Sequence, residues 1–503
     1  MIKMKEAPVA GLRAAANAVS KAGRLPLRAM FANDERSLNG NYVLYLLFEA
    51  EDGGFSLLTS RIDAKLPLEF PSLTNLLPAA AWYEREIHDL FGLKPAGHPD
   101  LRPLVLHEPW PADCFPLRKD FTTVPEVSGA VSGKQPVAVH GEGVFEVPVG
   151  PIHAGIIEPG HFRFSQAGEN VIRLDPTLFY THRGIEKSLE GLPVERAIYR
   201  IERTCGVCSV SHALSFAQAA EAIAGTEVPL RAQYMRVLLA ELERLYNHIG
   251  DVGNICAGVG FAVGASQAAR QKETLMRFNE EMTGNRFLRG MIVPGGVTTD
   301  IGGELIRHAS SLINALLPDF KELVEILESN AGFIDRCRQT GVLPRQVAAD
   351  LAVVGPAARA SGLDADFRRD HPYAVYDRLE FKVPVRRHGD VEDRLWLRVS
   401  EVRESCELVR QALAFLASQK GECRTELAFP AAGGSSFGWS ESARGANIHW
   451  LMLDANRRIY RYAIRSASYP NWPAVALAAP GNIIPDFPLI NKSFELCYAC
   501  LDR

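Results

Sequence analysis

Two short stretches organise this sequence: Arg203-Thr-Cys205-Gly-Val-Cys208-Ser-Val-Ser-His212, and Cys497-Tyr-Ala-Cys500 near the end of the chain. Each stretch contains a Cys-x-x-Cys pair, and two thiolates at this spacing can converge on one metal centre. A large part of the chain separates the two pairs, so only the tertiary fold can bring them together. The sequence therefore predicts a chain that builds one buried four-thiolate site.

The spacing by itself leaves the bound group open. Four thiolates suit zinc, an iron–sulfur cluster or nickel, and they suit magnesium or calcium poorly. The cysteine pairs of a zinc ribbon usually lie about 15 to 20 residues apart within one small module. The wide separation in this chain argues against a zinc ribbon. Zinc in another arrangement, an iron–sulfur cluster, a less common thiolate metal centre, and core or redox cysteines all remain possible interpretations.

Composition excludes several classes of protein. The 503 residues are 47% hydrophobic and 23% charged, as expected for a soluble globular chain of roughly two to four domains. The net charge of -4 gives no electrostatic reason to expect nucleic-acid binding. No apolar run follows the first residues, and none reaches the length of a membrane helix, so we expect neither a secretory signal nor a membrane span. Nine cysteines without a signal peptide indicate a reduced, cytoplasmic compartment.

The first part of the chain is predicted to be a small α/β domain over residues 1–121. Strands are expected over 41–48 and 55–62, on either side of the turn Asp52-Gly-Gly. A helix is expected over 79–91, because its apolar residues recur at helical spacing. Residues 122–145 are rich in Gly, Ser and Pro without any helical period, which is typical of a linker.

The second domain is predicted to cover residues 146–503 and to be mainly helical. Leu238, Leu242 and Leu245 form one apolar stripe, and long amphipathic helices of this kind pack as bundles. The expected fold class is α+β, with a small α/β N-terminal domain followed by a large, mainly α-helical bundle domain with peripheral β-strands. The expected elements are a hairpin over 163–173, helices over 209–224, 230–249 (ended by Gly250), 266–283, 305–329 and 399–417, and a strand over 449–453.

Two groups of motifs resemble subunits of respiratory complex I. Trp82-Tyr-Glu-Arg-Glu-x-x-Asp-Leu-Phe-Gly92, then His98-Pro-Asp-Leu-Arg102, then Pro116-Leu-Arg-Lys-Asp-Phe121 resemble its 30-kDa subunit, which docks on neighbours and carries no cofactor. The chain from Gly150-Pro151 through His182-Arg-Gly-Ile-Glu186 resembles its 49-kDa subunit.

The cysteine motifs add a second resemblance. Arg203-x-Cys-Gly-x-Cys-x-x-x-His212 and Cys497-x-x-Cys500 are similar to the two cysteine motifs of [NiFe]-hydrogenase large subunits, which are homologous to the 49-kDa subunit. A fused chain that keeps both pairs resembles the large subunit of a group 4 membrane-bound [NiFe]-hydrogenase, of the formate hydrogenlyase type. The resemblance implies an enzyme that interconverts H2 with protons and electrons.

The resemblance also implies the ligands of a nickel–iron centre. Cys205 and Cys497 would be terminal ligands of nickel, and Cys208 and Cys500 would bridge to an iron that carries CO and cyanide. The thiolate of Cys497 and the guanidine of Arg444 are the two candidate bases. Arginine is a poor proton acceptor because its free pKa is so high, so a fixed cation is the surer role for Arg444.

Two glutamates align with functional positions of the family. Glu158 aligns with a glutamate that passes protons away from the terminal thiolate, although a Glu before Pro-Gly is more often a turn residue. Glu186 aligns with a glutamate near a structural metal at the C-terminal segment, either magnesium or iron. The alternative for Glu186 is an ion pair with Arg183 or Lys187.

Two further positions are expected to support the centre. His212 would hydrogen-bond a thiolate or lock the C-terminal segment, with a satisfied core histidine as the alternative. Glu495-Leu496 stands where the family usually has Asp-Pro, so the contact of Glu495 with Arg444 is expected to shift. Asn247 falls where many members have an Asp, so one acidic group is expected to be absent there.

Partners and location follow from the resemblance. It implies a [4Fe-4S] small subunit, ferredoxin-like subunits and membrane-anchor subunits of a complex I-like assembly, with formate dehydrogenase as a candidate electron donor. The chain would be cytoplasmic and peripheral on the inner face of the membrane. Two alternatives remain: a complex I-like quinone-site subunit with vestigial cysteines, in which His153 lines a quinone pocket, and a structural assembly subunit with zinc. Metal content separates all three.

Overall fold

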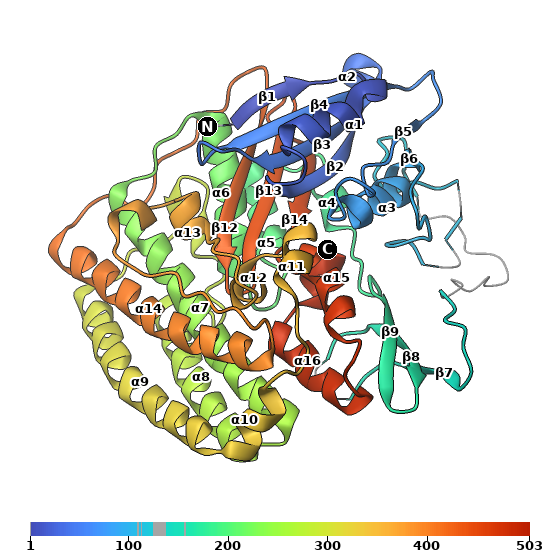
Figure 1. Ribbon diagram of the computed structural model, residues 1–503. Coiled ribbons are helices and arrows are strands. Elements are labelled where there is room, and N and C mark those ends of the chain that lie inside the picture. Colours follow the sequence, from blue (N-terminus) through green and yellow to red (C-terminus); the bar gives the residue numbers. More distant parts are fainter. Residues whose placement is uncertain (1, 108–109, 112, 124–136, 155–156) are drawn as a thin grey trace.

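The N-terminal part is a four-stranded sheet covered by short helices (Figure 1). In the computed structural model, residues 2–107, 110–111, 113–123, 137–154 and 157–503 are described. The strand order is β1-β4-β3-β2, with β1 parallel to β4 and the other pairs antiparallel. The predicted strands and helix of this part are confirmed. Its elements are β1 (Ile2–Glu6), α1 (Leu12–Val19), β2 (Leu27–Glu35), α2 (Arg36–Asn39), β3 (Asn41–Glu49), β4 (Phe55–Asp63), β5 (Glu69–Pro71), α3 (Ala80–Phe91) and β6 (Lys94–Ala96).

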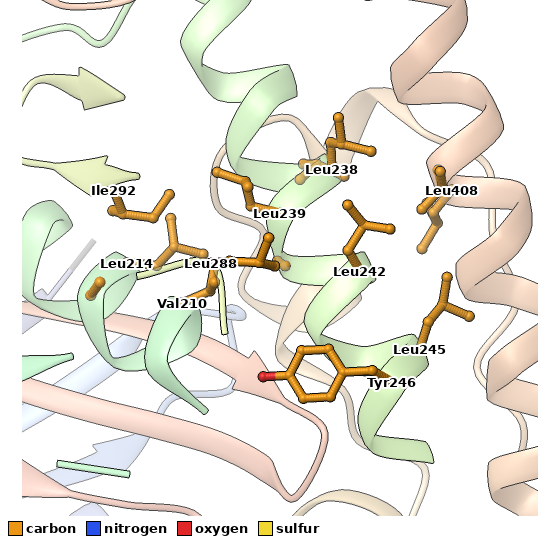
Figure 2. Close-up of a cluster of buried hydrophobic side chains, with 14 of the residues drawn as sticks. Val210, Leu214, Leu238, Leu239, Leu242, Leu245, Tyr246, Leu288, Ile292 and Leu408 are labelled. Atoms are coloured by element: carbon orange, nitrogen blue, oxygen red, sulfur yellow. The ribbon is translucent and has the colours of Figure 1, made fainter. Parts of the chain in front are cut away.

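Long helices form the centre of the remaining chain, as predicted. α7 (Leu230–Val259) packs against both α14 (Val391–Ser418) and α8 (Ala262–Thr283), and α9 (Gly303–Ser329) packs against α8 and α14. α6 (Ser209–Ala224) lies on the other side of α7, so α7 is buried on most of its circumference. Figure 2 shows this core, in which the labelled side chains of α6, α7 and α14 are Val210, Leu214, Leu238, Leu239, Leu242, Leu245, Tyr246 and Leu408.

A three-stranded antiparallel sheet lies between α6 and the N-terminal sheet. It consists of β12 (Gly434–Ser442), β13 (Gly445–Leu453) and β14 (Ile459–Arg465), of which only the end of β13 was predicted. One face packs on α6, where Gly438 is required because a Cβ there would lie 2.0 Å from the carbonyl oxygen of Ser215. The other face shares an apolar cluster with the N-terminal sheet, including Trp450. This sheet therefore joins the N-terminal part to the helical bundle.

The C-terminal helices and a small sheet complete the fold. β7 (Val144–Val149), β8 (His161–Ala167) and β9 (Asn170–Thr177) form an antiparallel sheet, in which β8 and β9 are the predicted hairpin. β7 begins within the last two residues of the predicted linker, and residues 124–136 of that linker lie outside the described residues. The other elements are α4 (Ile185–Leu189), α5 (Val194–Ile201), β10 (Ile292–Val293), β11 (Gly296–Val297), α10 (Ala331–Cys337), α11 (Arg345–Asp350), α12 (Gly355–Ala360), α13 (Phe367–Asp370), α15 (Ser468–Ala478), α16 (Phe487–Phe494) and α17 (Tyr498–Asp502).

The predicted overall class, α+β with a small N-terminal part and a large helical part, is confirmed. No helix within the described residues is long and apolar enough to cross a membrane.

One prediction about α7 was wrong. The helix was expected to end before Gly250, but it continues for more than two further turns to Val259. Gly250 and Gly253 face α8, and a Cβ at Gly253 would lie 2.7 Å from the Cβ of Ala268. These glycines allow two helices to approach closely, and this packing outweighs their low helix propensity of about 1 kcal/mol each. The extension places Asp251 on the buried face of α7.

The close approach at Gly253 yields a stability prediction. Gly253→Ala forces α8 to move, because the added Cβ overlaps Ala268, and overpacking of this kind costs about 1–3 kcal/mol. Thermal unfolding of the purified variant should show a lower melting temperature. Gly303→Ala at the start of α9 is the matched control, because a Cβ there would meet only the end of the Arg307 side chain, at 3.6 Å. Equal melting temperatures for Gly253→Ala and the wild type would contradict the packing role.

Candidate metal centre

The two cysteine pairs lie at the starts of two helices. Cys208 is the residue that precedes α6, and Cys205 lies in the turn before it. Cys497 precedes α17, and its sulfur accepts a hydrogen bond from the backbone N–H of Cys500 at 3.3 Å. The N-terminus of a helix favours negative charge, so the position before α6 suits a thiolate.

The fold brings the two pairs into contact. The Sγ atoms of Cys205 and Cys497 lie 3.4 Å apart, and the sulfurs of Cys205, Cys497 and Cys500 all lie within 4.8 Å of one another. Cys208 belongs to the same buried cluster. Cys497 is half-buried, whereas the other three are buried. Across the described part of the chain, this is the group of at least three Cys, His, Asp or Glu side chains whose ligand atoms converge in this way.

The electrostatics of this cluster oppose ionisation of its thiols. Contact with Cys208 raises the pKa of Cys205 well above its usual range, and contact with Cys205 does the same to the pKa of Cys497. Sulfurs this close cannot all be ionised unless positive charge compensates them, which is what a bound metal provides. The donor set of soft sulfurs fits a thiophilic transition metal and does not fit magnesium or calcium.

Arg444 is a fixed cation held next to the cluster. It lies in the turn between β12 and β13, where its Nε donates to the carbonyl oxygen of Glu495 at 2.9 Å and its Nη1 donates to Oδ1 of Asn247 at 2.6 Å. Its Nη2 donates to Oδ1 of Asp251 at 2.9 Å. Burial alone would lower the pKa of Arg444, but Asp251 and Cys208 hold it far above its usual value. The guanidinium therefore stays protonated.

Asp251 is a functional candidate that sequence reasoning missed. One acidic group near the metals was expected to be absent, because Asn247 stands where many members of the family have an Asp, and Glu495 was the expected contact of Arg444. Asp251 supplies that charge from one turn further along α7. Glu495 contributes less, since its carboxylate lies 3.7 Å from Nη2 of Arg444. The four-residue spacing of Asn247 and Asp251 was a usable signal, but ending the helix at Gly250 concealed it.

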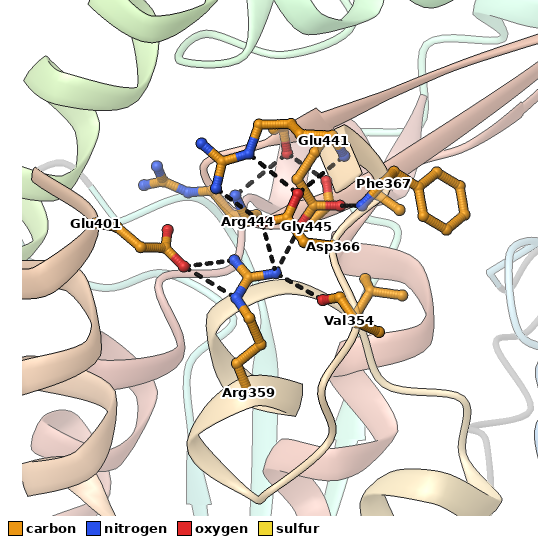
Figure 3. Close-up of polar contacts among 12 residues, drawn as sticks. Val354, Arg359, Asp366, Phe367, Glu401, Glu441, Arg444 and Gly445 are labelled. Carbon is orange, nitrogen blue, oxygen red and sulfur yellow. Dashed lines mark hydrogen bonds and ion pairs between the residues drawn. The ribbon is translucent and has the colours of Figure 1, made fainter. Parts of the chain in front are cut away.

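A chain of buried charges supports Asp251. Arg398 donates to Oδ2 of Asp251 at 3.1 Å, and Nε2 of His248 lies 2.7 Å from Oε2 of Glu401. Glu401 also accepts from Nη2 of Arg359 at 2.6 Å, as Figure 3 shows. Burial would raise the pKa of Glu401, but Arg359 and His248 hold it well below its usual value. These ion pairs connect the metal-binding region to the centre of the bundle.

Arg359 is the junction of this network (Figure 3). Its Nη1 lies 2.9 Å from Oε1 of Glu441 and 3.4 Å from Oδ2 of Asp366, and its side chain is completely buried. Burial and the charge of Asp366 raise the pKa of Glu441 to about 7. One guanidinium therefore compensates several carboxylates that water cannot reach.

Glu158 and Glu186, the two glutamates predicted to act near the C-terminal segment, lie in different surroundings. Glu158 is half-buried, and its Oε2 accepts a hydrogen bond from the backbone N–H of Ala499 at 2.7 Å, so it lies against the segment that carries the second cysteine pair. Glu186 is buried and pairs with Arg503 at 3.2 Å rather than with Arg183 or Lys187. Lys187 instead pairs with Glu190.

His212 lies between the cysteines and the central sheet. Its Nδ1 is 2.9 Å from Nε2 of His449 on β13. Burial would raise the pKa of Cys500, but its fellow cysteines and then His212 lower it well below the usual range. The Nε2 of His212 is buried without a hydrogen-bond partner, so the predicted hydrogen bond from His212 to a thiolate stays a prediction.

Comparisons with known proteins agree with this geometry. Residues 7–127 match the 30-kDa subunit of respiratory-chain NADH dehydrogenase, and residues 258–433 and 423–503 match its 49-kDa subunit. Residues 183–251, which include the first cysteine pair, match the nickel-dependent hydrogenases.

Relatives that match this chain along most of their own length show the family. The chain is 36% identical to formate hydrogenlyase subunit 5 of Escherichia coli, over 95% of this chain and 84% of that protein. It is 37% identical to hydrogenase-4 component G of the same organism, over 96% and 84% of the two chains. The chain belongs to the complex I-related nickel-dependent hydrogenases. The carbon monoxide-induced hydrogenase of Rhodospirillum rubrum is also similar, at 33% identity over 71% of this chain and 99% of that protein.

The junction at Arg359 yields the second prediction. Arg359→Met removes the cation that pairs with Glu441 and one of the two partners of both Glu401 and Asp366, and breaking a buried pair in this way costs about 3–5 kcal/mol. The melting temperature of this complex I-related hydrogenase should fall substantially. Arg338→Met, at the exposed pair with Glu392, is the matched control and should leave the melting temperature unchanged. A similar result for both variants would be evidence against the network.

Asp251 yields the third prediction. Asp251→Asn keeps the size of the side chain but removes the charge that holds Arg444. We expect hydrogen turnover to fall about 10- to 100-fold with the nickel content unchanged, because supporting residues at metal sites have effects of this size. Gas-chromatographic H2 assays together with metal analysis would measure both quantities. Asp335→Asn on the exposed face of α10 is the control. Unchanged turnover in Asp251→Asn would rule out this role.

Proposed function

We propose that this chain interconverts H2 with protons and electrons at a nickel–iron centre held by Cys205, Cys208, Cys497 and Cys500. The carrying observation is the convergence of sulfurs from two remote segments, with 3.4 Å between Cys205 and Cys497, in a chain of the nickel-dependent hydrogenase family. A nickel–iron centre with CO and cyanide on its iron would supply the site at which H2 is split or formed. The cysteines hold the metals and exclude water from the buried side.

The half-buried sulfur of Cys497 is the proposed base. Cys497 is half-buried whereas the other three cysteines are buried, so we propose that a proton leaves the cluster from this residue. Glu158 contacts the same segment two residues further on, through its bond to the N–H of Ala499. We therefore propose that Glu158 receives the proton from the Cys497 thiol and passes it towards solvent.

Arg444 has a different role in this proposal. The sequence offers two candidate proton acceptors, Cys497 and Arg444. The ion pair with Asp251 keeps the Arg444 guanidinium charged, and a charged guanidinium cannot accept a proton. Arg444 instead orients and polarises the reacting ligand through its positive charge, while Asn247 and Glu495 fix its orientation.

The partners of this chain are inferred from its chemistry and its relatives. Apart from the four clustered cysteines, the described residues contain no converging group that would bind an electron-transfer cluster. Electrons must therefore pass to another subunit, for which we propose a [4Fe-4S] small subunit with ferredoxin-like and membrane-anchor subunits. We propose association with the inner face of the cytoplasmic membrane through these subunits. By analogy with the relative named formate hydrogenlyase subunit 5, we propose H2 evolution with formate dehydrogenase as donor.

A quinone-site scaffold of complex I type is the competing function. His153, its candidate quinone ligand, is half-buried and its Nε2 contacts the carbonyl oxygen of Gly160 at 2.7 Å. That function does not require four converging sulfurs, so the cysteine cluster favours hydrogen chemistry.

Replacement of the proposed base tests the function. Cys497→Ser removes a thiolate ligand, so nickel content and H2 turnover should both fall to background. Mass-spectrometric metal analysis and infrared spectroscopy of CO and cyanide stretches would measure the change in the purified enzyme complex. Cys114→Ser, at a half-buried cysteine outside the cluster, should retain both. Nickel and turnover retained in Cys497→Ser would contradict the proposal, and zinc alone in the wild type would indicate a structural site.

A further inference from the structure

The segment that carries Cys497 and Cys500 is anchored by its last residues. The carboxylate of Asp502 accepts hydrogen bonds from the backbone N–H groups of Phe179 at 3.0 Å and Thr181 at 2.9 Å. The N–H of Arg183 donates to the carbonyl oxygen of Arg503 at 2.7 Å. The segment therefore lies in a slot formed by residues far away in the sequence.

The side chain of Arg503 fills the deepest part of this slot. Its Nη2 lies 2.6 Å from Oε2 of Glu86, and its Nη1 lies 3.2 Å from Oε1 of Glu186. Its Nη1 also donates to the carbonyl oxygen of Ile464 at 2.8 Å, and its Nε donates to that of Leu501 at 3.2 Å. Four of the five guanidinium N–H groups thus have oxygen acceptors, and the residue is only 4% exposed.

These oxygens are the ones that a divalent metal would need. The family resemblance implies a structural magnesium or iron near Glu186. Hard divalent ions bind several carboxylate and carbonyl oxygens at once, but here Glu86, Glu186 and two carbonyls already bind the guanidinium. Oε1 of Glu186 also accepts the N–H of Ile464 at 2.7 Å.

The space beside Arg503 is equally restrictive. A cavity of about 30 Å³ adjoins Arg503, Glu86 and Glu186, and aromatic side chains such as Tyr469 line much of it. It has room for about two water molecules. Magnesium usually keeps several of its waters, so a hydrated ion does not fit. A second positive charge next to the guanidinium would also be repelled.

We propose that the guanidinium of Arg503 takes the place of the second metal as the cation that locks the cysteine-bearing segment. Glu86 comes from α3 in the N-terminal part, and Glu186 comes from α4 in the helical part. The one cation therefore ties the cysteine-bearing segment to both parts of the chain. Arg503 is three residues from Cys500, so loss of this lock would loosen a thiolate ligand of the proposed nickel–iron centre.

Metal content and stability of the nickel-loaded, purified enzyme complex test this proposal. After exhaustive treatment with EDTA, magnesium, calcium and manganese should each be far below one equivalent, and the melting temperature of this subunit should be unchanged. A stoichiometric divalent ion, or a fall in melting temperature upon its removal, would overturn the proposal. These measurements do not depend on hydrogen turnover, so they remain informative if the proposed function fails.

Two substitutions at Arg503 test the role of its charge. Arg503→Met leaves the buried carboxylate of Glu186 and the half-buried carboxylate of Glu86 without this cation and should lower the melting temperature by roughly 5 °C or more. Arg503→Lys keeps the positive charge but has fewer hydrogen-bond donors, so it should lower the melting temperature less. Equal effects of the two variants, or none, would overturn the proposal.

Glu86→Gln provides an independent variant far from the cysteines in sequence. It removes one of the two carboxylates that hold Arg503, so the melting temperature should fall while the nickel content is retained at first and lost faster on warming. Glu422→Gln, at an exposed glutamate, is the matched control and should match the wild type. If Glu86→Gln also matches the wild type in both measurements, Arg503 is not the lock.

Discussion

Mutual repulsion among the sulfurs of four closely spaced cysteines, three buried and one half-buried, explains how the surrounding structure is arranged. Sulfurs 3.4 to 4.8 Å apart resist simultaneous ionisation, so the protein must hold them together and compensate their charge. A rigid frame holds them together, and a bound metal cation would compensate their charge. Cys208 lies against α6, and the second pair lies in a slot formed by the residues around Phe179 and Thr181. The fold brings together segments that cannot meet locally.

The same constraint explains the unusual number of buried charges around the centre. Arg444 must stay protonated beside the thiolates, and Asp251 ensures this at a distance of 2.9 Å. A buried Asp then needs its own partners. Arg398 pairs with Asp251, and further into the bundle Arg359 pairs with Glu401, so oppositely charged side chains follow one another inward from the centre. Near the second cysteine pair, Arg503 compensates two glutamates in the same way. Buried ion pairs contribute little net stability, but each is costly to break, so the arrangement is held in one geometry.

Local sequence patterns predicted much of the secondary structure, because the apolar residues of these helices and strands recur at the spacing of the element they form. α6 begins and ends at the predicted residues, since Gly225 ends it in a left-handed conformation. Gly250 was misinterpreted because the same residue type also serves close helix packing, and only the position of α8 distinguishes the two uses. Strand β12 was missed for a related reason. Its Gly438 is needed because α6 packs closely against it, and α6 is remote in the sequence.

Local motifs were enough to predict a four-cysteine site, the family and the helical class, because Cys-x-x-Cys pairs and amphipathic periods are local properties of the chain. It could not determine how the charges around the sulfurs pair with one another. Asp251 next to Arg444, and Arg503 between Glu86 and Glu186, are contacts across long stretches of chain. Tertiary structure decided them, because the energy of a charge depends on its burial and on the groups that folding places within a few ångströms of it.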